Sequence, residues 1–293
     1  KVFTHDPYNP YSLSDNTCSA LLMDRHNRLW IGTLNKGLNL YDERTQRFYH
    51  IVIRDQKVPD GTSFDVKILA EDPEGNIWVG TGTGQPFKIT LPASLQQNFP
   101  NQPDFTNQIQ LSQLQLNTKV YNSLNLDFSF KPNGEGLTGL NNGIYAFNWK
   151  KPTGLTKLNL FPNDSSGIFD FYHDVRQDFL VISTSHQLKC WYKGVAKTIA
   201  LPLSSGQGVK IKPIDGHTIA LSVASHLWLF SPAALFGKDS LTEQNAFLTF
   251  PPNLYAVTKL FRDKTGNIWV GTSGYGIRKF NPRVNQFHSY LPR

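Results

Sequence analysis

The residues able to do chemistry stand singly along the chain. His173 is followed by Asp174, and a histidine beside a carboxylate can serve in acid–base catalysis when a reacting group lies within hydrogen-bond reach. The same position suits a packed or surface histidine, because an expected innermost strand meets its turn there. Nucleophile elbows, His-Glu-x-x-His and Cys-x-x-Cys pairs do not occur in the sequence. We therefore expect no catalytic residue.

Three glycine-containing segments resemble ion or phosphate loops. The runs that begin at Asp72 (Asp-Pro-Glu-Gly-Asn) and at Asp263 (Asp-Lys-Thr-Gly-Asn) share residues with calcium loops but lack the full ligand spacing and the closing Glu. The run Gly80 to Gly84 lacks the Lys-Ser/Thr ending and the following helix of a phosphate loop. We read all three as turns and expect no metal site and no cofactor.

These turns belong to an internal repeat, which decides the fold. Segments 24–33, 72–81 and 263–272 align without gaps and share the pattern Asp-x-x-Gly/Asn-x-Ile/Leu-Trp-Ile/Val-Gly-Thr. Degenerate copies start at Lys131, Asp174 and Asp215, so that six anchors are spaced by 48, 59, 43, 41 and 48 residues. Strand patterns and turn signals recur about every ten residues. A period of 40 to 50 residues with four strands predicts an all-β protein, a β-propeller of four-stranded blades.

We expect one propeller domain over residues 1–293, with six blades visible and seven in a longer parent protein. Its blades are expected at about 18–51, 64–117, 120–160, 168–201, 208–250 and 254–291, with 1–17 as the end of a preceding blade plus a linker. Residues Lys1 to Thr4 resemble the outermost strand of a blade. For this reason we expect another blade upstream.

The shared residues have structural roles. Aspartate accepts backbone hydrogen bonds across a turn, glycine or asparagine tolerates a positive φ at its end, and tryptophan fills the space between two sheets. The residues given these roles are Asp24, Trp30, Asp72, Trp78, Asp263 and Trp269.

Composition narrows the function classes. Aromatic residues make up 13% and charged residues 17% of the chain, which suits a β-rich globular protein. The formal net charge is +7, and residues 119 to 212 hold eleven Lys/Arg against six Asp/Glu. That surplus suits either a solvated surface or a face that attracts anionic polymers. Clusters typical of nucleic-acid binding are missing, so we expect no nucleic-acid partner.

The two cysteines, Cys18 and Cys190, lie in different repeats, and we expect them to be unbonded. No apolar run of the sequence is long enough to span a bilayer.

Candidate ligand residues come from the turns between second and third strands, which in a propeller share one face with the connections to the innermost strands. Amides, cations and rings in these turns suit hydroxyl-rich ligands, although turn residues are commonly polar. The candidates are Asn35, Lys36, Gln85, Asn142, His186, His226 and Tyr275.

A segment rich in Gln and Asn, residues 96 to 117, lengthens the second repeat. It fits a strand pair that extends the edge of blade 2, and it also fits a flexible loop that contacts a partner.

The repeat resembles the two-component regulator propeller family. The likeness extends to segments 37–48 and 276–287 and to the linker 5–16; it is strong in blades 1, 2 and 6, whereas blades 3 to 5 share spacing and strand pattern. The resemblance implies the extracytoplasmic, periplasmic sensor region of a membrane-bound regulator, commonly a hybrid histidine kinase and in many cases responsive to glycans. It implies a non-catalytic domain with an oligosaccharide ligand, a homodimer formed through the parent protein, and membrane attachment through parent segments. A propeller polysaccharide lyase or hydrolase and a dimerisation scaffold are the alternatives.

Overall fold

The computed structural model describes residues 2–51, 65–82, 84, 86–92, 106, 109–116, 125–162, 166–201, 209–223, 226–242, 244, 246–249, 257–272, 276–281 and 286–290. The chain divides into two compact units, Lys1–Leu158 and Asn159–Arg293, and each unit contains three β-sheets. Among the described residues, no helix has the length and apolar character needed to cross a membrane.

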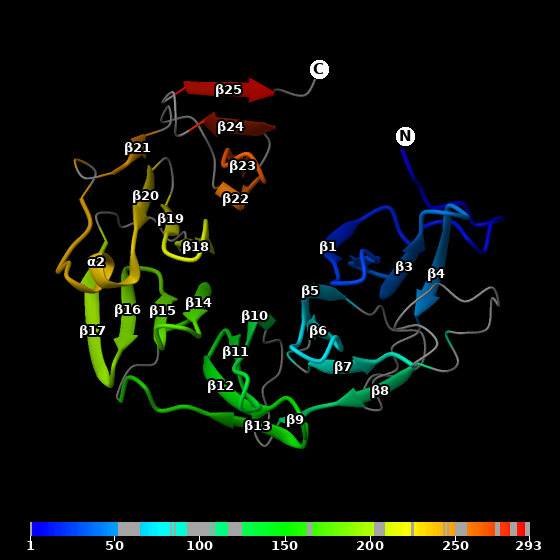
Figure 1. Cartoon of the computed structure of the whole chain (residues 1–293), viewed down its shortest axis with the longest axis horizontal. Helices are drawn as coiled ribbons and strands as arrows, with labels where there is room; N and C mark the ends of the chain where they lie inside the picture. The colour runs from blue at the N-terminus through cyan, green and yellow to red at the C-terminus, as the bar shows by residue number, and fades with distance from the viewer. Residues whose placement is uncertain are drawn as a thin grey trace. The chain divides into compact units, whose positions relative to one another are not determined.

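The first unit holds blades 1 to 3, whose strands lie side by side in chain order (Figure 1). Blade 1 consists of β1 (Cys18–Met23), β2 (Leu29–Thr33), β3 (Leu38–Asp42) and β4 (Arg47–Ile51). Blade 2 consists of β5 (Val66–Glu71), β6 (Ile77–Thr81), β7 (Phe87–Thr90) and β8 (Gln110–Gln113). Blade 3 consists of β10 (Asn125–Phe130), β11 (Glu135–Leu140), β12 (Gly143–Asn148) and β13 (Gly154–Lys157), joined at its edge by β9 (Gln115–Leu116).

The second unit holds blades 4 to 6. Blade 4 consists of β14 (Asp170–Asp174), β15 (Phe179–Ser183), β16 (Gln187–Tyr192) and β17 (Val195–Ala200). Blade 5 consists of β18 (Lys210–Pro213), β19 (Ile219–Val223), β20 (His226–Phe230) and β21 (Leu248–Thr249), with the short helix α2 (Pro232–Phe236) between its last two strands. Blade 6 consists of β22 (Val257–Arg262), β23 (Ile268–Thr272), β24 (Ile277–Asn281) and β25 (Gln286–Tyr290).

Each blade is an antiparallel meander. Five of the six anchors found in the sequence lie between the first and second strands of their blades, and the sixth, Asp174, is the last residue of the first strand of blade 4. The all-β fold of four-stranded propeller blades is therefore confirmed. The seventh blade in a parent protein stays a prediction.

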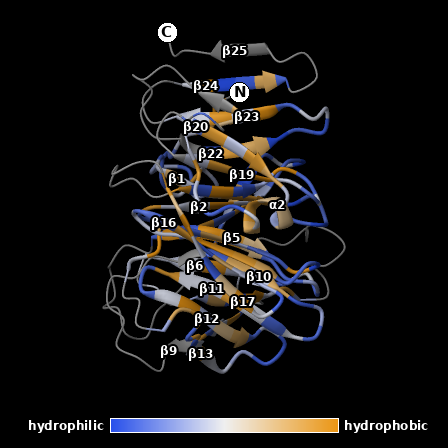
Figure 2. Cartoon of the chain, turned by 90° about the vertical axis from the view of Figure 1, so that its left-hand side faces the viewer, coloured by the Kyte–Doolittle hydropathy of each residue, from blue (hydrophilic) through white to orange (hydrophobic). Residues whose placement is uncertain are grey.

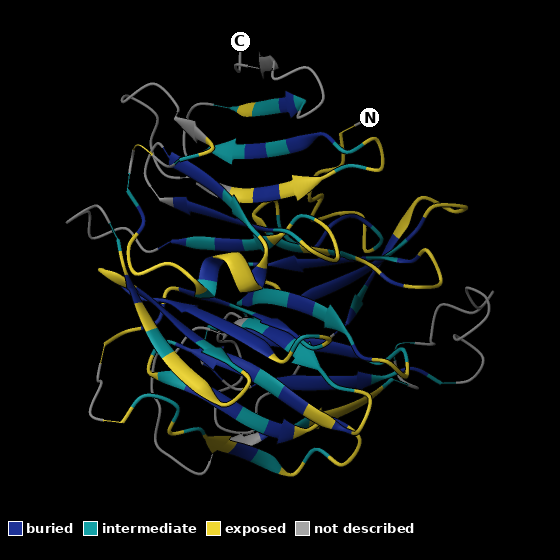
Figure 3. Ribbon diagram, turned by 60° about the vertical axis from the view of Figure 1, so that its left-hand side comes forward, coloured by how far each residue is buried: buried dark blue, intermediate teal, exposed yellow. Residues whose placement is uncertain are grey.

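The core forms where the faces of successive blades meet. Between blades 1 and 2, Trp30 lies with Val66 and Leu69 in one buried cluster, and between blades 2 and 3, Trp78 lies with Phe128 and Phe147 in another. Clusters of the same kind join blades 4 and 5 and blades 5 and 6. Hydrophobic residues concentrate in the strands, and exposed residues lie mainly at the turns (Figures 2 and 3).

The repeated aspartate organises the first turn of its blade. In the turn of blade 2, Oδ1 of Asp72 accepts hydrogen bonds from the backbone N of Glu74 at 2.9 Å and of Asn76 at 3.0 Å, while Oδ2 accepts one from Nε1 of Trp78 at 3.0 Å. Gly75 has φ +86°. Blades 1 and 6 repeat this pattern with Asp24, Asn27 and Trp30 and with Asp263, Gly266 and Trp269. In all three blades the aspartate thus holds its turn and accepts a hydrogen bond from the indole.

The degenerate blades replace parts of this arrangement. In blade 3, Lys131 occupies the anchor position, and its backbone O accepts a hydrogen bond from Nε1 of Trp149 at 2.8 Å, so a tryptophan beyond the third strand fills the core. In blade 4, Asp174 still accepts backbone hydrogen bonds from Arg176 and Gln177, but the positive φ moves one residue on, to Asp178. This shift explains why the fourth repeat aligns poorly with the pattern.

The three motif tryptophans differ in how far they are buried. Trp30 and Trp78 are 0% exposed, whereas Trp269 is partly exposed. Among the described residues of its unit, the buried cluster that includes blade 6 does not contain Trp269. The expectation of burial holds fully for the first two and partly for the third.

The outermost strands of three blades are paired along their outer edge. In blade 3, β9 runs parallel to β13. In blade 4, Ala200 of β17 forms a parallel bridge with Ser240 and donates its N–H to Asp239 O at 3.0 Å. In blade 1, the N–H of Phe48 donates to Tyr11 O at 2.9 Å. We call these edge-covering segments (Tyr11–Ser12, β9 and Asp239–Leu241) the straps.

The Gln/Asn-rich insert therefore ends in two strands on different blades. Its residues 110–113 form β8, the outer strand of blade 2, and residues 115–116 form β9 on blade 3, separated by the buried Leu114. The insert therefore forms neither a strand pair on the edge of blade 2 alone nor, in these residues, a loop. Most of residues 96–108 lie outside the described residues.

The segment before blade 1 is not a strand in residues 2–6. The ring of Phe3 packs edge-on against Tyr41 and Phe48, with centroids 5.2 and 5.3 Å apart. The assignment of this segment to the end of a preceding blade stays a prediction.

Candidate ligand-binding turns

The turn between β2 and β3 is held by its backbone and by one threonine. Thr33 Oγ1 donates to Gly37 O at 3.0 Å and accepts from Lys36 N at 3.1 Å, and Gly37 has φ +75°. The side chains of Asn35 and Lys36 are therefore exposed on an ordered turn. The same hydrogen bond, from Thr272 Oγ1 to Gly276 O at 2.9 Å, closes the corresponding turn of blade 6.

Asp15 joins this turn of blade 1, although it was not among the predicted site residues. Its Oδ2 accepts a hydrogen bond from Asn35 Nδ2 at 2.8 Å. The hydrogen bond from Thr17 N, followed by that from Asn35, lowers the pKa of the Asp15 carboxyl. A polar residue just before an innermost strand, at the same end of the blade as the turn, is the signal that points to it.

Two further candidates are exposed on comparable turns. Asn142 lies between β11 and β12 and accepts a hydrogen bond from Tyr145 OH at 3.1 Å. His186 lies between β15 and β16, where Thr184 Oγ1 donates to Gln187 O at 3.1 Å, as in blade 1. Amide, imidazole and ammonium groups held in this way can donate or accept hydrogen bonds to a polar ligand.

His226 is placed differently from the other candidates. It opens β20, is 6% exposed, and its ring stacks on Trp228 with centroids 5.7 Å apart. A side chain in this position packs within blade 5 and presents little surface to a ligand. Gln85 and Tyr275 lie outside the described residues.

The His173–Asp174 pair is also used structurally. His173 is 8% exposed, with Nε2 3.5 Å from Asp178 Oδ1, while Asp174 holds the backbone of its own turn. Neighbouring Tyr172 has its pKa raised to about 12 by burial and by the charge of Asp174. In the part of the chain that the structure describes, no group of three or more His, Cys, Asp or Glu is arranged to hold a metal ion.

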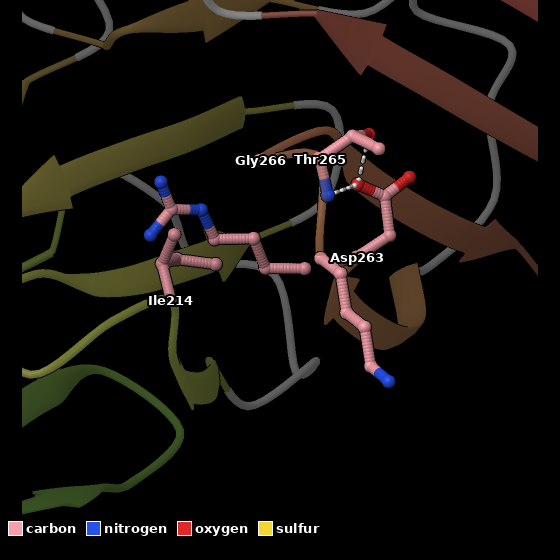
Figure 4. A pocket seen from close by; sticks show the side chains of 6 residues that line it. Ile214, Asp263, Thr265 and Gly266 are labelled. Carbon is pink, nitrogen blue, oxygen red and sulfur yellow. Dashed lines mark hydrogen bonds between the residues drawn. The ribbon is translucent and has the colours of Figure 1, made fainter.

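A cavity lies at the other end of the strands, in the second unit. It has a volume of about 350 Å³ and lies at the turn between β22 and β23 (Figure 4). The turn between β23 and β24, which holds Tyr275, leaves the opposite end of β23. The cavity is therefore separate from the predicted ligand face.

Comparison with protein families agrees with the repeat. A family model described as two component regulator propeller matches residues 12–35, 65–83 and 251–274. Three segments of the chain are therefore similar to the repeat of this family. The three matches cover the three strong repeats, and the degenerate blades 3 to 5 lie outside them.

Solved structures share the fold. Virginiamycin B lyase from Staphylococcus aureus is 11% identical, with 94% of this chain and 85% of that chain covered and a TM-score of 0.69. Raptor from Chaetomium thermophilum is 11% identical, with 94% and 24% covered and a TM-score of 0.62. The extracellular domain of a protein described as a hybrid two component system from B. thetaiotaomicron is 15% identical, with 100% and 42% covered and a TM-score of 0.49. The chain thus spans less than half of that domain. No curated protein matches the sequence.

Proposed function

We propose that this propeller is a non-catalytic, extracytoplasmic ligand-sensing domain of a membrane-bound two-component regulator. It detects a glycan or a related small ligand and passes the signal to a histidine kinase in the parent protein, whose homodimer it joins. The observation that carries the proposal is the match of the family model to the three Asp–Trp repeats.

The exposed turns support a hydroxyl-rich ligand. Asn35, Lys36 and His186 project from turns that are closed by a threonine hydrogen bond. Asn142 is exposed on the corresponding turn of blade 3, where it accepts a hydrogen bond from Tyr145 OH. Side chains on ordered turns lose little conformational entropy on binding, which favours recognition by a few polar contacts.

The use of the carboxylates supports the non-catalytic part. Asp24, Asp72 and Asp263 each accept an indole hydrogen bond and two backbone hydrogen bonds within their own turns. A carboxylate engaged in this way is not a free general acid or base.

The test is a binding and turnover assay on one preparation of the chain. Titration with a panel of oligosaccharides should show binding without product formation. Depolymerised product at a rate on the order of 1 per second or more would favour the lyase or hydrolase instead.

Variants then locate the contact. Asn35→Ala and His186→Ala each remove an exposed group from a separate turn, and the turn that binds should lose about fivefold in affinity, the equivalent of one hydrogen bond. His217→Ala is the matched control, because His217 is exposed at the opposite end of the strands. Unchanged binding in both turn variants would exclude these turns as the contact.

A further inference from the structure

The cavity in the second unit lies against the anchor turn of blade 6. Its lining residues are Ile214, Arg262, Asp263, Lys264, Thr265 and Gly266 (Figure 4). Ile214 is the last residue before the anchor of blade 5, so the cavity lies at the junction of the first turns of two successive blades.

The same junction between blades 1 and 2 is filled by an arginine. Arg25, one residue after the anchor Asp24, donates from Nε to Glu71 Oε1 at 2.6 Å and from its Nη atoms to the backbone O of Asp72 at 2.5 Å and of Pro73 at 2.9 Å. A Cβ added to Gly75 would lie 3.6 Å from Arg25 Nε. The guanidinium therefore covers the turn glycine of the following blade.

Blade 5 has no side chain at the position of Arg25, because the residue after its anchor Asp215 is Gly216. The guanidinium beside the turn glycine of blade 6 is instead that of Arg262, whose Nη2 would lie 3.4 Å from a Cβ on Gly266. The ion pair is also reversed. Arg262 stands where blade 2 has Glu71, and its Nη1 donates back to Asp215 Oδ2 at 2.9 Å. The arginine in place of Glu71 changes the sign of the charge at this position, and its guanidinium forms one side of the cavity.

The charges around the cavity favour an anion. Lys264 is exposed, and no described residue accepts a hydrogen bond from its ammonium. Arg262, the other cation that lines the cavity, pairs with Asp215 through Nη1. The Asp263 carboxylate is directed into its own turn, where it accepts from Thr265 N and from Trp269 Nε1.

We propose that this cavity binds the carboxylate of a small molecule, with Arg262 and Lys264 as its cationic contacts and Ile214 as the apolar contact. A volume of about 350 Å³ holds roughly ten waters, which corresponds to a ligand of monosaccharide size. The arginine side chain is well suited to a carboxylate because its planar donors match the two oxygens.

The experiment is an NMR titration of the ¹⁵N-labelled chain at low salt with three probes of similar size: D-glucuronate, D-glucose and N-ethylguanidinium. Glucuronate should shift the amide signals of residues 262–266, while the other two leave them unchanged. Equal shifts with glucose would remove the requirement for a carboxylate. Shifts with N-ethylguanidinium alone would show a site for a cation like the Arg25 guanidinium, and either result overturns the proposal.

Three variants separate the cavity from general charge attraction. Lys264→Gln should weaken glucuronate binding about two- to fivefold, and Arg262→Gln should weaken it about tenfold or more. Lys238→Gln, which removes an exposed lysine elsewhere in the unit, should leave it unchanged.

A fourth variant tests the space itself. Gly216→Arg adds a cation but also places a long side chain at the junction of the two turns, so binding should be lost because the added side chain occupies space there. Stronger binding by Gly216→Arg, or equal losses in Lys264→Gln and Lys238→Gln, would contradict the proposal.

Discussion

Nε1 of Trp78 donates to Oδ2 of Asp72 at 3.0 Å across six residues of chain. Blades 1 and 6 repeat this bond at 2.9 and 2.8 Å. The bond joins two roles of the repeat, because the aspartate that closes a turn also orients the indole that fills the space between blades. A buried indole N–H needs an acceptor, and the turn supplies it.

Replacement of these tryptophans should cost different amounts. Trp30→Ala and Trp78→Ala remove fully buried indoles and should each lower the free energy of unfolding by about 3 to 5 kcal/mol. Trp269→Ala removes a partly exposed indole and should cost about half as much, since less apolar surface is lost. Urea unfolding of the three variants measures this order. Equal costs would show that burial of the indole is not what separates them.

In blade 1 the anchor aspartate forms a buried ion pair, whereas in blades 2 and 6 an asparagine amide takes the place of the arginine. Arg28 Nε lies 2.6 Å from Asp24 Oδ2, whereas Asn76 and Asn267 occupy the same repeat position and donate to both carboxylate oxygens. Arg28→Asn should therefore cost less than about 1.5 kcal/mol, because its amide can replace the lost hydrogen bond. Arg28→Ala leaves the carboxylate without this partner and should cost about 3 kcal/mol or more. Thermal unfolding of the two variants is the comparison, and a greater loss in Arg28→Asn would count against the equivalence.

Acid should remove the contribution of the repeat aspartates. Burial raises the pKa of Asp24, but the hydrogen bonds from Trp30 and Arg28 outweigh it and hold this pKa below its usual range. Hydrogen bonds from Thr265 and Trp269 lower the pKa of Asp263 in the same direction. A lowered folded-state pKa gives stability that is complete above the unfolded pKa, near ~4, and is lost as the pH falls further.

The wild-type chain should accordingly be more stable than Asp24→Asn by a constant amount above about pH 5, and the difference should narrow below about pH 4. Chemical unfolding of both proteins from neutral to strongly acidic pH tests the direction. A difference that widens in acid would mean that the folded-state pKa is raised.

The motif glycine should tolerate substitution in some blades only. A Cβ on Gly32 would clash with Val66 Cγ1 of the next blade, so Gly32→Ser should cost about 1 to 3 kcal/mol by overpacking. Ser183 and Ser222 stand at the equivalent strand positions of blades 4 and 5 and are buried there. Their replacement by Gly should cost less than Gly32→Ser. Thermal unfolding of the variants measures this difference. An unchanged stability in Gly32→Ser would show that the Val66 side chain moves to make room for the added atoms.

The two thiols should react at very different rates. Both cysteines are free; Cys18 is exposed and Cys190 is buried, with its pKa raised to about 12 by burial. Because the thiolate is the reactive form, a thiol reagent should label Cys18 in the native chain and Cys190 after unfolding. Mass spectrometry of the labelled peptides reads this directly. Rapid native labelling of Cys190 would indicate that blade 4 opens locally.

The sequence reveals the parts of the fold that repeat. Asp, the positive-φ residue and Trp form one hydrogen-bonded unit, so their spacing predicts the turns and the order of strands. The pattern does not match blade 4, because the residue with positive φ is Asp178, one position later than in blades 1, 2 and 6. The pattern also does not predict the tryptophan of blade 3, because Trp149 reaches the core from a position after the third strand.

The candidate sites were less accessible to prediction because they depend on contacts between segments. Turn position alone placed His226 with the ligand residues, whereas its ring stacks on Trp228. Asp15 became visible through its hydrogen bond to Asn35. The cavity beside Gly266 is lined by residues of two turns, Ile214 of blade 5 and Arg262 to Gly266 of blade 6, so it could be found only once these two blades were known to pack together.

The straps have a consequence for how the protein behaves when concentrated. The outer strand of a blade presents unpaired backbone groups to solvent, and such an edge can add a strand from another molecule and start aggregation. In blades 1, 3 and 4, Tyr11–Ser12, β9 and Asp239–Leu241 occupy part of that edge with the chain's own backbone. These short segments therefore reduce the length of strand edge that is open to β-pairing with another molecule.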